Sequence, residues 1–449
     1  MIRLEAFREY VRGALWVFPS LAALGALIAG STLSQIEIGP DSPLAPIAFQ
    51  GTADDARALL IAISGTVITV IALVLGLTVV ALQLSSTQFS PRLLRNFLRD
   101  RPNQLVMSAF VATFAYSAAG LYTVGVSSGV RTEEYPRLAV SGSLVLLFAS
   151  LGLVVFFADH LVHSIQIDAI MRVVERSTVD SVRRGLRGSH EHSAFEVPPH
   201  AVVLRASRSG YVQTAHPELI MPTARKHGIS VRLCQRVGEH AVVGTPFAWI
   251  WSLRPEDPPL DPEVMRHAIE GAVRVGFERT YEQDAALGIR QLVDVACKAL
   301  SPAVNDPYTA IQAIDHLAVI FCSMACRPLG ADVVHDPDGG VSVTVPSRRF
   351  DEYLAIMCGL VRRYGSRETT VLLALIRLLS SCETVIQEFP DRLTAVAREA
   401  ALVLEVGEAA IEQPTDVEPV RAAVLALQQR IALRDQAASA DQASLPSMA

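Results

Sequence analysis

Lysine is almost absent from this sequence, which has only Lys226 and Lys298 among its 449 residues. Even with arginine included, basic residues number 39 against 45 acidic ones, and the net charge is −6 at pH 7. Proteins that bind nucleic acid usually carry a clustered basic surface. We therefore predict no nucleic-acid partner, and we attribute the shortage of lysine to compositional drift rather than to function.

Motifs for catalysis and cofactor binding are also missing. The sequence contains no P-loop, no GxGxxG turn and no HExxH pair. Its six cysteines include no CxxC pair, and Cys322 and Cys326, which share a helical face, lack further ligands at zinc-site spacing. We predict small core residues there and free thiols, as expected in the cytoplasm. No metal, cofactor or catalytic residue is expected, so an enzyme is the least favoured class.

Apolar residues, by contrast, make up 51% of the chain. A helix needs about 20 residues to cross a hydrocarbon core about 30 Å thick. Four apolar stretches reach that length, at residues 14–33, 59–84, 105–126 and 138–158. We predict an α-helical integral membrane protein whose four transmembrane helices form a domain of residues 1–158. No span has a charged residue in its middle, which argues against a proton pump but not against a channel.

Arginines predict the orientation of these spans, because positively charged loops stay on the cytoplasmic side. They cluster before the first span, between the second and third, and after the fourth, at Arg3, Arg8, Arg12, Arg92, Arg95, Arg99, Arg101, Arg172, Arg176, Arg183, Arg184 and Arg187. The loop after the first span is acidic instead. We expect both termini to be cytoplasmic and the protein to lie in the lipid bilayer of a bacterial inner membrane.

One face of the second span consists of small and polar residues at helical spacing. The pore-lining candidates on and beside this stripe are Gly65, Thr69, Gly76, Gln83, Thr87, Gln88 and Ser90. Such a stripe either lets helices pack closely or lines a hydrated path. Packing is the commoner use, but the two glutamines favour water, because an unpaired amide in lipid costs several kcal/mol.

The fourth span ends in an acidic residue and a histidine, Asp159 and His163, spaced to be neighbours on a helix. A nearby carboxylate favours the charged form of a histidine, which would make this pair a pH sensor. The alternative is an ordinary solvated helix end.

The remaining chain predicts an α+β cytoplasmic region. We expect a helical extension and linker at 159–196, followed by a small β-rich domain at 197–258. The β-rich domain has short alternating strands typical of a small barrel or sandwich. Residues 259–435 predict a mostly helical domain that contains one β-hairpin at a DGG turn, and residues 436–449 a disordered tail.

A polar cluster in the helical domain has two interpretations. It comprises Arg279, Thr280, Gln283 and Asp284, followed by Ser301, Asn305 and Asp306. As structural residues they would form a helix cap and a buried Arg–Asp pair that ties two helices together. As a functional site they would form an anion or nucleotide pocket in which Arg279 clamps the ligand.

Two segments resemble a known family: LQLSSTQFSPRLLRNFLRDRPNQ at 82–104 and GFERTYEQDAALGIRQLVDVACKALSPAVNDPYTAIQAIDHL at 276–317. They are similar to the bacterial domain-of-unknown-function family 2254, a group of predicted membrane proteins. The resemblance spans nearly the whole chain and implies the same architecture, but it implies no activity. This sequence departs from it at CQRVGEHA (234–241), where RPGDF-like residues are expected.

Our leading hypothesis is a homo-oligomeric ion channel or channel-like transport protein with a cytoplasmic gating or sensing region. Several copies would be required, because four spans are too few to enclose a path. The alternative is a membrane-anchored sensor or scaffold whose soluble half binds an anionic ligand or a protein partner.

Overall fold

The structure is a computed structural model that describes residues 16–36, 46–88, 101–124, 135–164, 166–185, 197–253, 262–337 and 340–444. It divides into two compact units, Met1–Ile170 and Met171–Ala449, which we call the N-terminal and C-terminal units. Each unit has its own core.

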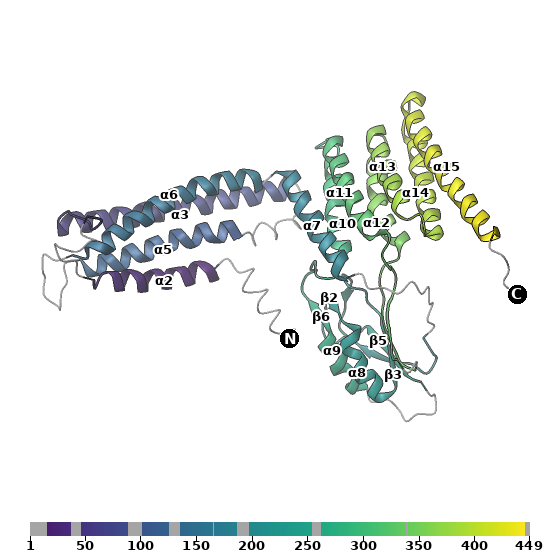
Figure 1. The fold of residues 1–449 in the computed structure, drawn as a ribbon, viewed down its shortest axis with the longest axis horizontal. Helices are drawn as coiled ribbons and strands as arrows, with labels where there is room; N and C mark the ends of the chain where they lie inside the picture. Colours follow the sequence, from purple (N-terminus) through teal and green to yellow (C-terminus); the bar gives the residue numbers. More distant parts are fainter. Residues whose placement is uncertain are drawn as a thin grey trace. The chain divides into compact units, whose positions relative to one another are not determined.

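Four helices that lie alongside one another make up the described part of the N-terminal unit (Figure 1): α2 (Val17–Leu33), α3 (Ala53–Gln88), α5 (Arg101–Thr123) and α6 (Arg137–Ser164). Apolar side chains from α3, α5 and α6 form their shared core, which includes Val67, Phe110 and Phe157. The α2 helix approaches α5 closely at Gly30, where a Cβ would stand 3.0 Å from the Ala119 Cβ.

The outer surface of these helices is also apolar. Leu24, Leu73 and Phe148 are exposed large apolar side chains on α2, α3 and α6. Exposed apolar surface of this extent is unfavourable in water and suits a membrane. The segments Ala53–Ala81, Pro102–Thr123 and Arg137–His163 are long and apolar enough to cross one.

The first predicted span corresponds to α2, which has 17 residues and is therefore only about 26 Å long. The fourth helix of sufficient length and apolarity is instead α11 (Pro307–Ala325), in the C-terminal unit. There, Ile314, Leu317 and Phe321 are fully buried. The apolar side chains of α11 are thus explained by their burial in the core of the C-terminal unit, without a membrane.

The C-terminal unit contains three helical hairpins stacked side by side (Figure 1). They are α10 (Ala285–Ala299) with α11, α12 (Phe350–Tyr364) with α13 (Thr369–Val385), and α14 (Pro390–Ala410) with α15 (Pro414–Ser444). The last helix runs to Ser444, through most of the segment predicted to be a disordered tail. Its end is rich in alanine and glutamine, which are strong helix formers.

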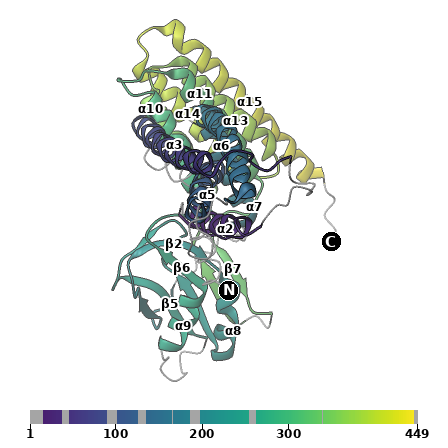
Figure 2. The same ribbon diagram turned by 90° about the vertical axis from the view of Figure 1, so that its left-hand side faces the viewer.

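Among the described residues, eight strands and two further helices lie beside the hairpins (Figure 2). In chain order they are β1 (Val202–Arg205), β2 (Gly210–Ala215), α8 (Pro217–His227), β3 (Ile229–Leu233), β4 (His240–Ala241), β5 (Pro246–Ser252), α9 (Pro262–Ala272), β6 (Val273–Gly276), β7 (Asp332–His335) and β8 (Ser342–Val345). The strand orders are β1-β5-β3-β8-β7 and β4-β2-β6, and among the described strands only β3 and β8 pair in parallel. The two sheets share one apolar core with α8 and α9.

This arrangement differs from the predicted one in two respects. The described strands pair as two open sheets and do not close into a barrel. Moreover, β6 comes from beyond the predicted β-rich segment 197–258 and interrupts a stretch expected to be helical. Strands β7 and β8, by contrast, pair antiparallel where the hairpin within 259–435 is predicted. Residues Val273–Gly276 pair with β2, so tertiary pairing overrides their local helical pattern.

Helix α7 (Ile167–Gly185) follows α6 in the chain and packs within the C-terminal unit from Met171 onward. Its buried face includes Met171, Val174 and Val182, at helical spacing. Its last residue, Gly185, borders the cleft described next.

Candidate functional site

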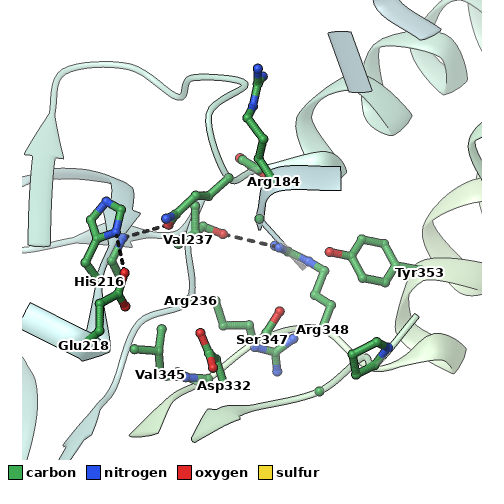
Figure 3. A pocket seen from close by; sticks show the side chains of 17 residues that line it. Arg184, His216, Glu218, Arg236, Val237, Asp332, Val345, Ser347, Arg348 and Tyr353 are labelled. Atoms are coloured by element: carbon green, nitrogen blue, oxygen red, sulfur yellow. Dashed lines mark hydrogen bonds and ion pairs between the residues drawn. The ribbon is translucent and has the colours of Figure 1, made fainter. Parts of the chain in front are cut away.

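A cleft of about 670 Å³, including space open to solvent, lies in the C-terminal unit. The ends of α7, β2 and β8 and the start of α12 converge on it (Figure 3). Three arginines line it, Arg184, Arg236 and Arg348, together with His216 and Tyr353. It therefore gathers charged side chains from elements that are far apart in the sequence.

The loop before α10 forms one wall of the cleft around a buried ion pair. The Arg279 guanidinium donates from Nε and Nη2 to the two carboxylate oxygens of Asp284, at 2.6 and 2.9 Å. The Asp284 side chain is only 1% exposed. Gly238 lies directly over this pair with φ +86°, and a Cβ there would collide with the carboxylate. The turn after β3 therefore requires glycine at this position, both for its backbone conformation and for space.

Gln283 connects this loop to two other elements. Its Oε1 accepts a hydrogen bond from the backbone N–H of Ala215, at the end of β2, at 2.9 Å. Its backbone also packs against Gly185 of α7, where a Cβ would stand 2.9 Å from the Gln283 Cα. The loop thus holds α7 and β2 in place on either side of the cleft.

The predicted polar cluster divides between the two ends of α10. Arg279, Thr280, Gln283 and Asp284 precede the helix, whereas Ser301, Asn305 and Asp306 follow it. The helix has 15 residues and is therefore about 22 Å long. The structure thus places Gln283 and Asp284 in the lining of the cleft, whereas Arg279, Thr280 and the second group do not line it.

The second group forms a turn and a helix cap. Asp306 accepts hydrogen bonds from the backbone N–H and the hydroxyl of Thr309, at 3.1 and 2.5 Å, at the start of α11. These bonds hold the pKa of Asp306 below its usual value. Asn305 has a left-handed backbone with φ +49°, and the Ser301 hydroxyl donates to the Lys298 carbonyl. The local hydrogen bonds of Asp306 and Ser301 correspond to the structural interpretation of this segment.

Arg279 is not placed to clamp a ligand in the cleft, because its Nε and Nη2 donate to Asp284 and it does not line the cleft. Arg184 and Arg348 line the cleft instead, and in Figure 3 the Arg184 side chain extends away from the other labelled residues. Arg184 is exposed and makes no hydrogen bond or ion pair with the described part of the chain. Arg348 makes one long hydrogen bond, 3.4 Å, to the Val237 carbonyl. No motif in the sequence singles out either residue, since they lie on separate elements.

Tyr353 adds a buried hydroxyl to the same cleft. The residue is only 3% exposed, and it lines the cleft near Arg348. Figure 3 shows this hydroxyl on the side where the Arg348 side chain lies, and the charges of Arg348 and Asp284 both act on it. Burial raises the pKa of Tyr353 to about 12, so the hydroxyl keeps its proton and can donate a hydrogen bond.

Two of the three carboxylates that line the cleft are engaged in pairs. Glu218 pairs with His216 at 3.3 Å, and Asp284 pairs with Arg279. Arg236 is likewise bound to Glu352 at 2.6 Å. Since three arginines face three carboxylates, the formal charge of the lining sums to zero. The uncommitted groups are nevertheless donors, which suits an anionic ligand rich in acceptors.

A family model for a "predicted membrane protein (DUF2254)" matches residues 12–381. The chain belongs to the DUF2254 family. This DUF2254 protein is 41% identical over 423 residues to uncharacterised proteins of Mycobacterium bovis and Mycobacterium tuberculosis, covering 92% of this chain and 80% of each relative. No solved structure matches it. The resemblance read from residues 82–104 and 276–317 is therefore confirmed, and the second of these segments forms the cleft wall and the α10–α11 hairpin.

The stripe of pore-lining candidates lies on the exposed side of α3 in the DUF2254 protein. Gly65, Thr69, Gly76 and Gln83 are exposed, and a Cβ at Gly65 or Gly76 would meet nothing within 4 Å. The opposite side of α3 carries the buried apolar residues of the core. The side chains of Thr87 and Gln88, and all of Ser90, lie outside the described residues. Helix packing within this chain therefore does not account for the described part of the stripe.

Asp159 and His163 are neighbours at the end of α6, as their spacing predicts. The His163 Nδ1 lies 3.5 Å from the Asp159 Oδ1, and both side chains are well exposed. An exposed pair of this kind contributes little to stability. Within the described residues, no group of three or more His, Cys, Asp or Glu residues could hold a metal ion.

Proposed function

We propose that this DUF2254 protein is a membrane-anchored sensor whose C-terminal unit binds a small anionic ligand in the cleft. The observation that supports this proposal is the pair of donors from Arg348 and Tyr353 at the cleft, beside Glu218 and Asp284, whose carboxylates are already paired. The arginine-rich loops further support a bacterial inner-membrane protein whose termini and C-terminal unit are cytoplasmic.

Thermal unfolding of the purified full-length protein in detergent, across a panel of small anions, tests this proposal. A ligand at 100 times its Kd stabilises a protein by about 2.7 kcal/mol if it binds only the folded state. We expect at least one anion to raise the Tm, and Arg348→Gln to abolish the rise.

Arg367→Gln is the matched control, because Arg367 is an exposed arginine beyond the opposite end of α12. It should leave the anion-dependent rise in Tm unchanged. An equal loss of the rise in both variants would mean that anions bind at the general surface, and the sensor proposal would then be abandoned.

A second candidate is an oligomeric channel-like protein in which α3 lines the path. It is supported by the exposed stripe, because Gly65 and Gly76 face open space on an otherwise apolar helix. Small residues on an outward face suit close packing against α3 of a second copy. They also suit the wall of a pore that is filled with water molecules.

Ion flux through liposomes that contain the full-length protein tests this candidate. Gly76→Leu should reduce flux and change the oligomeric state, although the side chain fits within one subunit. Gly152→Leu is the control, because Gly152 on α6 also has nothing within 4 Å of a Cβ. Flux no higher than in empty liposomes, or equal flux in both variants, would contradict the assignment of α3 as the pore helix.

A further inference from the structure

Large apolar side chains are exposed together at one end of the three-stranded sheet. Gly210, the first residue of β2, pairs with Ala241, the last residue of β4, and Gly276, the last residue of β6, pairs with the second residue of β2. The chain therefore leaves β4 and β6 at the same end of the sheet. The exposed residues that follow these two strands are Val242 (48% exposed), Val243 (56%) and Phe277 (95%).

The loops at this end contact one another. The Val243 N–H donates to the Ser209 hydroxyl at 2.9 Å, which joins the turn after β4 to the loop before β2. Gly210 packs on the end of β6, where a Cβ would stand 2.7 Å from the Gly276 carbonyl oxygen. The exposed side chains thus belong to one surface. We call residues 205–209, 242–245 and 277 the sheet-end surface.

This surface is positively charged. Arg208 is exposed and makes no hydrogen bond or ion pair with the residues that the structure describes. The Arg205 guanidinium donates from Nη1 to the Gly244 carbonyl at 2.7 Å, so its charge lies beside the turn that carries the two valines. The sheet-end surface contains no acidic residue, and its charge stays positive even when the neighbouring Glu278 is counted.

A groove of about 400 Å³, including space open to solvent, adjoins the sheet-end surface. Apolar side chains of β1, β5, α9 and β6 line it, together with three arginines and one glutamate. The formal charge of this lining is therefore +2, whereas that of the cleft is zero. One of the three arginines, Arg266, is paired with Glu263 at 2.9 Å, so Arg205 and Arg208 carry the available charge. Apolar surface beside unpaired arginines suits an amphiphile with an anionic head.

We infer that the sheet-end surface docks on an anionic lipid bilayer, with Phe277 and the two valines in the interfacial layer and Arg205 and Arg208 against lipid phosphates. Exposed apolar patches mark sites of interaction, and aromatic side chains favour the membrane interface. Arginines near a membrane surface are attracted by anionic lipids.

The connection between the two units favours a bilayer over a soluble partner. Helix α6 is long and apolar enough to cross a membrane and ends at Ser164, and α7 begins at Ile167. The C-terminal unit is therefore attached to such a helix by a short segment of chain. This attachment keeps the local concentration of lipid high, so that a modest apolar and basic surface is sufficient for docking.

This inference is independent of the proposed anion site. Ala215, the last residue of β2, lines the cleft, whereas the sheet-end surface lies at the first residue of the same strand. The strand has six residues and is therefore about 20 Å long. Docking would give the C-terminal unit a second attachment to the membrane, in addition to the connection between α6 and α7, and would leave the cleft open.

The test uses the full-length protein in nanodiscs of phosphatidylcholine, alone or mixed with phosphatidylglycerol. We expect hydrogen–deuterium exchange of amides 205–209, 242–245 and 277 to be several-fold slower in the anionic nanodiscs. High salt should reduce this protection, because it screens exposed charges. Arg208→Gln should reduce the protection about fivefold, the effect of one arginine at an anionic surface, and Phe277→Ser should remove most of it.

The controls are Arg367→Gln and Leu425→Ser, which replace an exposed arginine and an exposed leucine outside the sheets. Both should leave the protection unchanged. All four variants replace exposed side chains and should keep the Tm of the wild type, so that a loss of protection reports a loss of docking.

Three outcomes would overturn the inference. The first is equal exchange in neutral and anionic nanodiscs, and the second is an equal loss of protection in the test and control variants. The third is protection that depends on the number of protein copies in each nanodisc and not on the lipid, which would assign the surface to a second copy of the chain. The proposed anion site is tested separately, by the anion-dependent Tm in detergent, so either can fail without the other.

Discussion

Gly185, the last residue of α7, packs directly on the backbone of Gln283, so that a Cβ at Gly185 would stand 2.9 Å from the Gln283 Cα. Gln283 in turn accepts a hydrogen bond from Ala215 of β2 through its side chain. The shape of the cleft thus depends on a contact between two residues that carry no charge. This contact can be altered without removing any of the arginines or carboxylates that line the cleft.

Gly185→Ala should destabilise the protein by about 1–3 kcal/mol, because the added methyl group would force the backbones of α7 and the 277–284 loop apart. Chemical unfolding of the full-length protein in detergent measures this. Gly359→Ala is the control, since Gly359 lies within α12 and has nothing within 4 Å of a Cβ. That substitution should stabilise the protein by about 0.5–1 kcal/mol, because alanine is the better helix former. Equal effects of the two substitutions would show that α7 does not pack as described.

Asp284→Asn should destabilise the protein by about 3–5 kcal/mol, because it leaves the Arg279 guanidinium without its charged partner inside the protein. Asp351→Asn breaks the Arg349–Asp351 pair at 2.7 Å, in which both side chains are exposed, and should cost at most about 1 kcal/mol. Unfolding midpoints of the two variants give the comparison. A loss below 1 kcal/mol for Asp284→Asn would contradict the buried ion pair.

Tyr353→Phe should leave stability nearly unchanged, because it keeps the buried ring in place and removes only the hydroxyl at the cleft. If that hydroxyl donates to a bound anion, the same substitution should weaken anion binding about tenfold, the loss expected for a hydrogen bond to a charged group. Isothermal titration with inorganic phosphate tests this. Undiminished affinity would remove Tyr353 from the site.

Asp306→Ala should destabilise the protein by about 1 kcal/mol at pH 7, because it removes the cap of α11. The pKa of Asp306 is lowered in the folded state from 3.8, first by the Thr309 hydroxyl and then by the Thr309 backbone N–H. A lowered carboxyl pKa stabilises the fold above the unfolded pKa. This contribution is lost as the pH falls below about 3.8 and through the folded value.

The difference in stability between wild type and Asp306→Ala should therefore stay constant from pH 7 to about 4 and narrow at lower pH. Unfolding measured from pH 3 to 7 tests this course. Asp306→Asn is the control, because asparagine caps helices comparably and does not titrate. Asp306→Asn should keep most of the wild-type stability at pH 7, and its stability should lack the pH dependence that Asp306 contributes. A difference that grows on acidification would contradict the capping role.

Local patterns in the sequence predicted several features correctly. Length and hydropathy indicated the apolar helices α3, α5 and α6, and the helical spacing of apolar residues indicated α10 to α14. The motif in residues 276–317 identified the family. Each of these signals depends on residues that are close together in the chain, where period and composition are directly readable.

The strand pairing and the cleft depended on tertiary structure. Val273–Gly276 became β6 because β2 offered it a partner, and β8 joined β3 in parallel across a long stretch of chain. Arg236, Arg348 and Tyr353 all line the cleft although no spacing in the sequence relates them. The sequence by itself therefore determined which segments are apolar helices and which family the chain belongs to. Only the tertiary structure decided which donors share a site, because packing of distant elements brings those side chains together.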